Sequence, residues 1–213
     1  MSDQGTHGWL KQASTSSDDV RLSYEEWAST YDEDLAVWGY QAPLETASLL
    51  KSLIPPSSTI LDAGCGTGLV GAAIRHAGLT GDIDGIDLSP SSLEKARRRK
   101  IYRNLHPIDF QKLPLALDDN VYDALACVGV LTYVPDSESI LREFARIVRP
   151  KGIIVVTQRN DLFEERAFDQ TMKKLIDALL FSETTVTEPK QYLPKNPDFG
   201  SEIQVIYATL TVV

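Results

Sequence analysis

Residues 59–157 predict an α/β fold in which a mostly parallel sheet lies between two layers of helices. Short apolar runs alternate there with helical patterns, which is the order typical of βαβ units. The strand-like runs are apolar almost throughout, as expected of a sheet that is covered on both faces. Apolar residues make up 43% and charged residues 24% of the 213-residue chain, a composition that favours one soluble globular domain.

The N-terminal part is expected to contain a mobile arm followed by two helices. Residues 1–20 are rich in Ser, Asp, Gly and Gln, which is typical of a mobile arm. Tyr24, Trp27 and Tyr31 follow at spacings that place them on one helical face. That face either packs against the sheet or covers a ligand, in which case residues 21–56 form a helical lid over a core of residues 57–213.

The central part is expected to alternate strands and helices in a regular order. A helix after Pro43 precedes the first strand, and Pro55 ends it. The expected strands cover residues 59–61, 83–88, 105–110, 122–130 and 153–157, and the expected helices cover residues 69–76, 89–100 and 137–148.

The C-terminal part departs from this alternation. Residues 164–181 have the apolar spacing of an amphipathic helix, and strand-like runs cover residues 184–193 and 202–213. The linker between these two runs is too short for a helical crossover, so we expect them to pair antiparallel. The last run is apolar on both faces, which predicts a place inside the sheet and not at its edge.

Charge and cysteine content narrow the classes of function. Thirty acidic and 21 basic residues give a net charge of −9, which disfavours binding to nucleic acid or to an anionic membrane surface. The one basic cluster, residues 95–100, is expected to end a helix. Cys65 and Cys127 lie in apolar runs and are expected to be reduced and buried. Without a visible signal peptide or transmembrane segment, these features predict a cytoplasmic protein.

The strongest local motif is a glycine-rich turn between a strand and a helix, Leu61-Asp62-Ala63-Gly64-Cys65-Gly66-Thr67-Gly68. Such a turn lets a ligand approach the main chain at the N-terminus of a helix. Residues 66–71 also fit the G-x-G-x-x-G pattern of dinucleotide-binding proteins. Asp62 favours another ligand, because a carboxylate repels a pyrophosphate and attracts a ligand that carries an ammonium and a sulfonium.

Asp87 supplies the second indication of a nucleoside ligand. It closes a predicted strand 19 residues after Gly68, where an acidic side chain can accept hydrogen bonds from both hydroxyls of a ribose. Nucleotide-binding sheets of either cofactor type use such an acid, so Asp87 does not distinguish between them.

With these motifs, the chain resembles the class I S-adenosylmethionine-dependent methyltransferases from about Leu22 to the C-terminus. The glycine-rich turn is similar to the first motif of that family, and Gly85-Ile86-Asp87-Leu88-Ser89 is similar to its ribose-binding loop. The resemblance implies a Rossmann-like three-layer sandwich whose seven-stranded sheet has the order 3-2-1-4-5-7-6, with the last strand antiparallel. The methyltransferase-like proteins named for the Williams-Beuren syndrome chromosome region resemble it most, through Trp27-Ala28, Tyr31-Asp32 and the Cys-Gly-Thr-Gly-Leu-Val run.

The resemblance also implies which residues hold S-adenosylmethionine and release S-adenosylhomocysteine. Asp109 and Phe110 are similar to the segment that meets adenine, and Val128 ends the strand that passes the methionine part of the cofactor. The expected cofactor-binding set is Trp27, Tyr31, Asp62, Gly64, Gly66, Asp87, Leu88, Asp109, Phe110 and Val128. The residues expected to contact the acceptor are Tyr24, Tyr133 and Arg159.

The expected function is methyl transfer to a small-molecule acceptor. Displacement at a sulfonium depends mainly on holding the nucleophile in line and excluding water, so we predict no catalytic side chain. The three histidines have no metal-ligand spacing, and we predict no metal. Two alternatives stay open, namely an NAD(P)-dependent oxidoreductase that uses residues 66–71, and a non-catalytic module that binds the cofactor and a partner.

Overall fold

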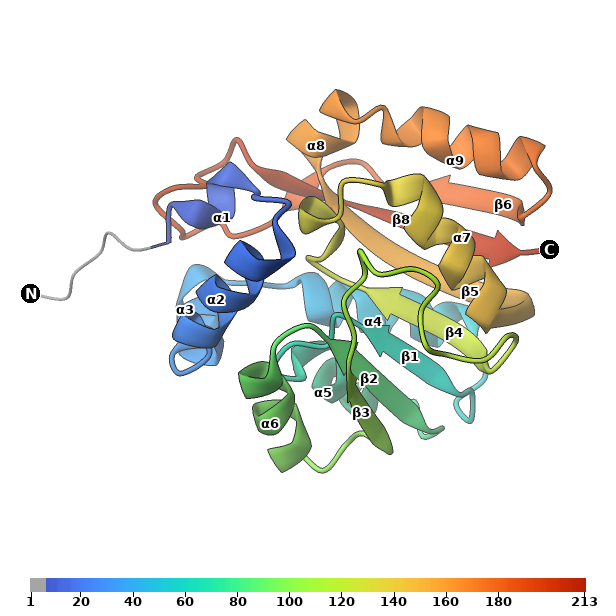
Figure 1. Cartoon of the computed structure of the whole chain (residues 1–213), viewed down its shortest axis with the longest axis horizontal. Helices are drawn as coiled ribbons and strands as arrows, with labels where there is room; N and C mark the ends of the chain where they lie inside the picture. Colours follow the sequence, from blue (N-terminus) through green and yellow to red (C-terminus); the bar gives the residue numbers. More distant parts are fainter. Residues whose placement is uncertain (1–6) are drawn as a thin grey trace, which may run out of the picture.

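The computed structural model describes residues 7–213, and most of them form helices and strands (Figure 1). The helices are α1 (Trp9–Gln12), α2 (Ser17–Trp27), α3 (Tyr31–Trp38), α4 (Ala42–Leu53), α5 (Leu69–His76), α6 (Pro90–Arg98), α7 (Ser137–Ile147), α8 (Asn160–Glu165), α9 (Phe168–Asp177) and the 3-10 turn η1 (Leu131–Tyr133). The strands are β1 (Ile60–Ala63), β2 (Ile83–Asp87), β3 (Asn104–Pro107), β4 (Tyr122–Cys127), β5 (Val148–Arg159), β6 (Phe181–Val186), β7 (Lys190–Gln191) and β8 (Gln204–Val212).

The strands form one sheet of order β3-β2-β1-β4-β5-β8-β6, and the two-residue β7 pairs with β8 beyond this path. Strands β1 to β5 are parallel, and β8 is antiparallel to both β5 and β6. This confirms the predicted order, with β8 as the last strand, and it confirms that β8 lies inside the sheet. The difference is β7, which breaks the run expected as one strand over residues 184–193.

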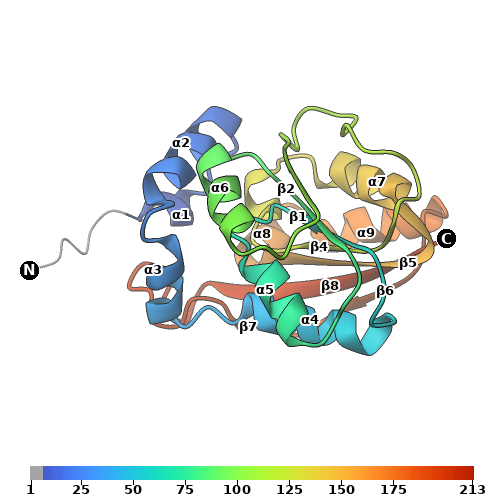
Figure 2. The same cartoon turned by 90° about the horizontal axis from the view of Figure 1, so that it is seen from below.

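Helices cover both faces of the sheet, which confirms the three-layer sandwich (Figure 2). Because side chains alternate along a strand, neighbours in β1 lie in different cores. Leu61 belongs to the core that contains Phe144 of α7 and Phe168 of α9, whereas Ile60 belongs to the core that contains Leu50 of α4 and residues of α5. Burial on both faces explains why these strands are apolar throughout.

The N-terminal region differs from the expected mobile arm. Residues 1–6 lie outside the described residues, but residues 9–20 form α1 and the first part of α2. Ser16 caps α2 by accepting a hydrogen bond from the Asp19 amide at 3.4 Å. Leu10 is buried in an aromatic cluster with Trp27, and this apolar contact offsets the entropy cost of ordering a polar segment.

Two further helices differ from the expectations. The aromatic residues predicted on one helical face are divided between α2, which ends at Trp27, and α3, which begins at Tyr31. The amphipathic run expected over residues 164–181 is broken by Ala167, whose backbone is left-handed with φ +47°, between α8 and α9. In both cases the apolar residues meet by tertiary packing and not along one helix.

None of the described helices is long and apolar enough to cross a membrane. Cys65 and Cys127 are free and buried, as predicted.

Candidate functional site

The glycine-rich turn after β1 brings the main chain to a pocket at the carboxyl ends of the parallel strands. Gly64 and Gly66 have φ +78° and +51°, a region that L-residues with side chains rarely adopt. A Cβ on Gly64 would lie 2.1 Å from Cγ2 of Val130, whereas a Cβ on Gly66 would have no neighbour within 4 Å. The backbone at Gly66 therefore faces open space, where a ligand can approach it.

Asp87 joins the end of β2 to this turn. Its two carboxylate oxygens accept hydrogen bonds from the backbone amides of Gly66 and Ser89, each at 2.8 Å. Burial raises the pKa of the carboxyl group, and these amide hydrogen bonds partly offset that effect. Asp87, Leu88 and Ser89 all line the pocket, so the acidic side chain is placed beside the glycine turn, as expected of a ribose-binding residue.

Asp109 and Phe110 form another wall of the pocket, beyond β3. Asp109 accepts hydrogen bonds from the Ser17 hydroxyl at 3.1 Å and from the Gln111 amide at 3.0 Å. Phe110 is only 7% exposed, and its ring stands edge-on to that of Phe144 in the core. A carboxylate that accepts hydrogen bonds next to an apolar ring can bind a flat heterocycle that carries an amino group.

The end of β4 supplies a further wall, because Val128, Gly129 and Val130 line the pocket. The Gly129 amide donates to the Thr157 hydroxyl at 2.8 Å, which fixes the loop to β5. A Cβ on Gly129 would lie 3.2 Å from the Tyr192 hydroxyl, so a larger residue at position 129 would crowd this tyrosine.

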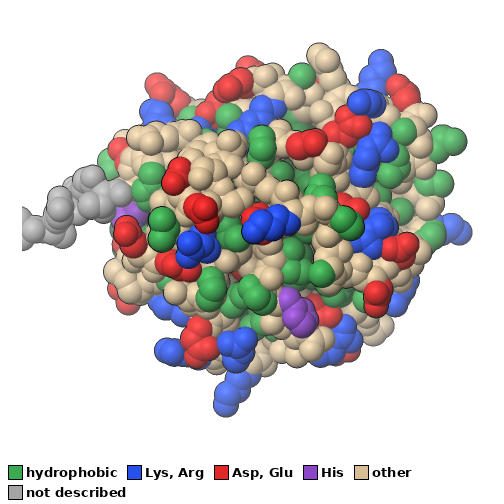
Figure 3. All heavy atoms as spheres, viewed as in Figure 1, with side chains coloured by type: hydrophobic (Ala, Val, Ile, Leu, Met, Phe, Trp, Pro, Cys, Tyr) green, Lys and Arg blue, Asp and Glu red, His purple; other side chains and the backbone are tan. Residues whose placement is uncertain are grey.

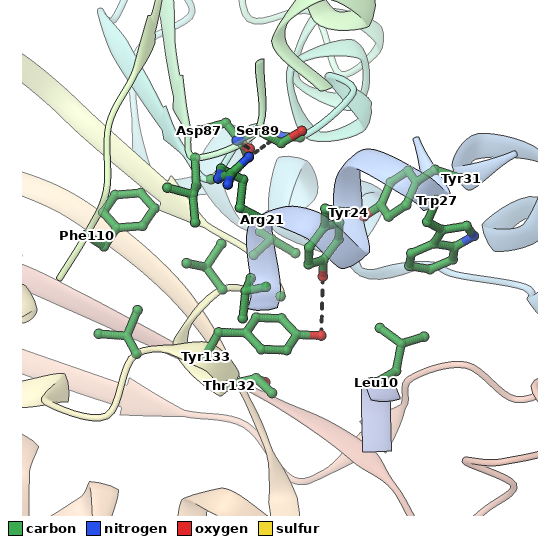
Figure 4. Close-up of a pocket in the computed structure, with 18 of the residues that line it drawn as sticks. Leu10, Arg21, Tyr24, Trp27, Tyr31, Asp87, Ser89, Phe110, Thr132 and Tyr133 are labelled. Atoms are coloured by element: carbon green, nitrogen blue, oxygen red, sulfur yellow. Dashed lines mark hydrogen bonds between the residues drawn. The ribbon is translucent and has the colours of Figure 1, made fainter. Parts of the chain in front are cut away.

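Aromatic side chains from α2, α3 and η1 form a further wall of the pocket (Figure 4). The rings of Trp27 and Tyr31 are 4.6 Å apart, and those of Tyr24 and Tyr31 are 6.0 Å apart. The hydroxyl of Tyr24 donates to that of Tyr133 at 3.3 Å, the contact drawn in Figure 4. The residues predicted to cover a ligand therefore line the same pocket as the glycine turn.

Arg159 lines the pocket, but its guanidinium group binds Asp161 and α1. It is 4% exposed and forms a two-point contact with Asp161, with N–O distances of 3.1 and 2.5 Å. It also donates to the carbonyl oxygens of Leu10 and Lys11 at 2.8 and 3.2 Å. In this structure Arg159 holds α1 against β5, whereas the sequence led us to expect a contact with the acceptor.

Asp62 is the one member of the expected cofactor-binding set that lies outside the pocket lining. Its side chain is fully buried beneath the glycine turn, where it accepts a hydrogen bond from Tyr102 at 2.6 Å. Its other oxygen has no hydrogen-bond partner among residues 7–213. Burial raises the pKa of Asp62 to about 7. The role of Asp62 toward the cofactor stays a prediction.

Several lining residues were not predicted from the sequence. They come from segments far apart in the chain: Leu10, Ser17, Arg21, Tyr40, Gln111, Thr132, Tyr192 and Phe199. Ser17 and Arg21 follow the helical spacing of α2 toward Tyr24, a signal that could have identified them. Tyr192 and Phe199 lie in the segment between β7 and β8, and no local pattern links that segment to the pocket.

The pocket fits a nucleoside with a positively charged tail. It spans about 1020 Å³ of space between atoms, part of it open to solvent. Asp87 and the open backbone at Gly66 line it, and so do aromatic rings, whose faces attract cations. Within residues 7–213, no group of three or more His, Cys, Asp or Glu side chains could hold a metal ion.

Comparisons with known proteins agree with this geometry. A family model described as a methyltransferase domain matches residues 61–156. Human methyltransferase-like protein 27 is 32% identical over 161 residues, which cover 73% of this chain and 65% of that protein. Demethylmenaquinone methyltransferase of Bacillus licheniformis is 36% identical over 104 residues, which cover 48% of this chain and 45% of that protein. The chain thus spans less than two thirds of the length of either relative.

Solved structures share the fold. An S-adenosylmethionine-dependent methyltransferase from Thermotoga maritima superposes with a TM-score of 0.63 at 19% identity, covering 88% of this chain and 97% of that one. At this identity, the match supports the architecture alone.

Proposed function

The chain carries a methyltransferase domain of the class I, S-adenosylmethionine-dependent family, and on this premise we propose that it transfers a methyl group from S-adenosylmethionine to a small-molecule acceptor. One observation carries the proposal. Gly66, Asp87, Phe110 and Val128, which end or follow four different strands, line one pocket together with the aromatic residues of α2 and α3. A protein that only kept the fold would not need these side chains to meet.

Each wall of the pocket has a proposed role toward the cofactor. The Asp87 carboxylate accepts hydrogen bonds from the ribose hydroxyls, and Leu88 packs beside the sugar. Asp109 accepts from the adenine amino group while Phe110 covers the ring. Gly64, Gly66 and Val128 admit the methionine part, and the aromatic rings lie near the sulfonium. The support for these roles is the lining of the pocket.

When bound, S-adenosylmethionine supplies an activated methyl group with a neutral leaving group. The residues of this chain then have to hold the acceptor in line with the methyl–sulfur bond and keep water out. The buried rings of Trp27 and Tyr133 suit both tasks, because they are rigid and apolar. In model reactions, orientation of this kind lowers the activation free energy by about 7–11 kcal/mol.

We also propose that the acceptor is small and that the protein acts in the cytoplasm. The names of relatives include a demethylmenaquinone methyltransferase and a ubiquinone biosynthesis O-methyltransferase, which supports a small acceptor. The face in Figure 3 carries Lys and Arg interspersed with Asp and Glu, and the net charge is −9. Neither feature favours nucleic acid. The free cysteines support a reducing compartment.

Calorimetric titration with S-adenosylmethionine, S-adenosylhomocysteine and NADH tests the proposal. We expect both adenosyl ligands to bind at one site and NADH not to bind. Binding of NADH in preference to the adenosyl ligands would support the oxidoreductase alternative. Binding of S-adenosylmethionine without methyl transfer to any acceptor would leave the non-catalytic module as the better description.

A further inference from the structure

Six aromatic residues line one pocket with the residues proposed to hold the cofactor. We call this set the aromatic chamber and define it by the residues Tyr24, Trp27, Tyr31, Tyr40, Tyr133 and Tyr192, all of which line the pocket. Their rings contact one another at centroid distances between 4.6 and 6.0 Å for the pairs Trp27–Tyr31, Tyr40–Tyr192, Tyr24–Tyr133, Tyr24–Trp27 and Tyr24–Tyr31. A small acceptor beside the sulfonium would therefore be surrounded by π-systems.

The six described residues that define the aromatic chamber carry no charge at physiological pH. Burial raises the pKa of Tyr24, Tyr31 and Tyr133 above the usual value of tyrosine, so their hydroxyls are neutral at physiological pH. Arg159, at its edge, is compensated by Asp161 at 2.5 Å and donates to α1.

The other charged lining residues belong to different surroundings. Asp87 and Asp109 are on the cofactor side, and Arg21 donates to Glu25 at 3.2 Å. The ring of His7 is tilted against that of Trp27, with 4.7 Å between the centroids, and its Nε2 atom lies 4.0 Å from a carboxylate oxygen of Asp34; His7 is not among the lining residues. Among the described lining residues, the aromatic chamber thus offers neither a free cation for an anionic acceptor nor a carboxylate or imidazole to deprotonate a phenol.

This arrangement favours a reaction that keeps a positive charge in the aromatic chamber throughout. A neutral nitrogen with a free lone pair needs no base, and its methylation moves the positive charge from sulfur to nitrogen. The faces of aromatic rings attract a cation in both positions. A phenolate or carboxylate acceptor would instead have to be desolvated beside neutral rings without a partner.

We propose, building on the proposed function, that the acceptor is a small uncharged aromatic molecule that is methylated on a pyridine-type ring nitrogen. The nitrogen lone pair forms the new bond to the methyl carbon while the carbon–sulfur bond breaks and its electron pair stays on sulfur. The products are S-adenosylhomocysteine, which is neutral at sulfur, and an N-methylated heteroaromatic cation. No proton is transferred.

Binding of the product cation tests the aromatic chamber directly. N-methylquinolinium and 1-methylnaphthalene have almost the same shape and differ in charge. With S-adenosylhomocysteine bound, we expect N-methylquinolinium to bind at least tenfold more tightly than 1-methylnaphthalene, measured by calorimetry or tryptophan fluorescence. Equal affinity, or tighter binding of the neutral compound, would overturn the proposal.

Turnover distinguishes the reacting atom. Quinoline, 1-naphthol and 1-naphthoate are matched bicyclic probes for transfer from methyl-labelled S-adenosylmethionine at pH 7.5, where a phenol remains protonated. We expect methylation of quinoline at least tenfold faster than that of 1-naphthol and none of 1-naphthoate. Faster methylation of 1-naphthol or of 1-naphthoate would overturn the assignment of nitrogen.

Binding of S-adenosylhomocysteine without methylation of quinoline would contradict this inference and leave the proposed function standing, whereas failure of both adenosyl ligands to bind would contradict the proposed function itself.

A matched pair of variants separates the ring from its hydroxyl. Tyr24→Phe keeps the aromatic face, and Tyr24→Leu removes it. We expect Tyr24→Phe to bind N-methylquinolinium within threefold of the unsubstituted protein and Tyr24→Leu to bind it at least fivefold more weakly, with S-adenosylhomocysteine binding retained in both. Unchanged affinity in Tyr24→Leu would contradict the role of the ring, and the melting temperature of each variant controls for folding.

Discussion

Asp87 is the side chain on which the cofactor site depends most directly. Its carboxylate holds the Gly66 and Ser89 amides at 2.8 Å, and it lines the pocket. One acidic residue thus holds the glycine turn in shape and can also accept hydrogen bonds from a ligand. This double role explains why the acidic residue stands at the end of the strand that pairs with β1.

We predict that Asp87→Ala weakens binding of S-adenosylhomocysteine by about 1–3 kcal/mol, because a charged acceptor for two hydroxyls is lost. Calorimetry measures this change. Asp82→Ala, just before the other end of β2, is the matched control, since Asp82 is exposed and pairs with Arg103 outside the pocket. Equal effects of the two substitutions would contradict the assignment.

The burial of Asp62 makes folding stability depend on pH. Its pKa is raised from 3.8 to about 7, so the folded state binds more protons than the unfolded state between these values. The contribution of this residue is therefore fully present below pH 4 and is lost as pH rises through about 7. We predict that the unfolding free energy of the unsubstituted protein, minus that of Asp62→Asn, falls between pH 4 and 8 by on the order of 4 kcal/mol at most. Urea denaturation at several pH values measures this difference, and a constant difference would show that Asp62 does not titrate as described.

Helices α2 and α3 are attached to the core by polar contacts with α6 and the residue that follows it. Arg99 donates to Asp32 at 2.5 Å and to the Thr67 carbonyl at 2.7 Å. Lys95 donates to the Ala28 and Ser29 carbonyls. The basic cluster at the end of α6 therefore does more than complement the helix dipole, because it anchors the N-terminal helices beside the glycine turn.

Arg159 anchors α1 in a similar way, and its removal should release that helix. We predict that Arg159→Ala increases amide hydrogen exchange in residues 9–27, because two carbonyl groups of α1 lose their donor. Mass spectrometry of peptides measures this change. Arg149→Ala on the same strand is the control, since Arg149 donates to Asn120 and Asp123 far from α1. Exchange in residues 9–27 that is the same in both variants would contradict an anchoring role.

The two cores on opposite faces share the strands of one sheet, so we expect the protein to unfold as one unit. Leu61 and Ile60, adjacent in β1, belong to different cores, and loss of either core would expose the same strand. The pocket lies where the sheet, the N-terminal helices and the β7–β8 segment meet, because residues of all three line it. A ligand there should stabilise all three.

We predict that S-adenosylhomocysteine at 100 times its dissociation constant raises the unfolding free energy by about 2.7 kcal/mol. Urea denaturation followed by tryptophan fluorescence and by circular dichroism measures this shift, and the two signals should change together. Transitions at different urea concentrations for the two signals would show instead that the N-terminal helices, which carry Trp27, unfold separately.

Local patterns were sufficient for much of the site. The turn at residues 61–68 and the acid at Asp87 follow from glycine freedom and from the place of a polar residue after an apolar strand. Both could be predicted because they depend on neighbours in the chain. The strand order followed from the family resemblance and the short final linker.

Tertiary contacts governed the rest. Nothing near Asp62 in the chain shows that Tyr102 covers it, or that Arg159 turns toward α1. The rings of Trp27 and Tyr31 are in contact although the two residues lie in different helices. The helical spacing therefore predicted the correct neighbours, but the single helix that it implied was wrong. The chain's own pattern specified the glycine turn, the strand sequence and the acids. Tertiary packing decided where the buried charges Asp62 and Arg159 point, because burial and hydrogen bonding to distant segments set the energy of a buried charge.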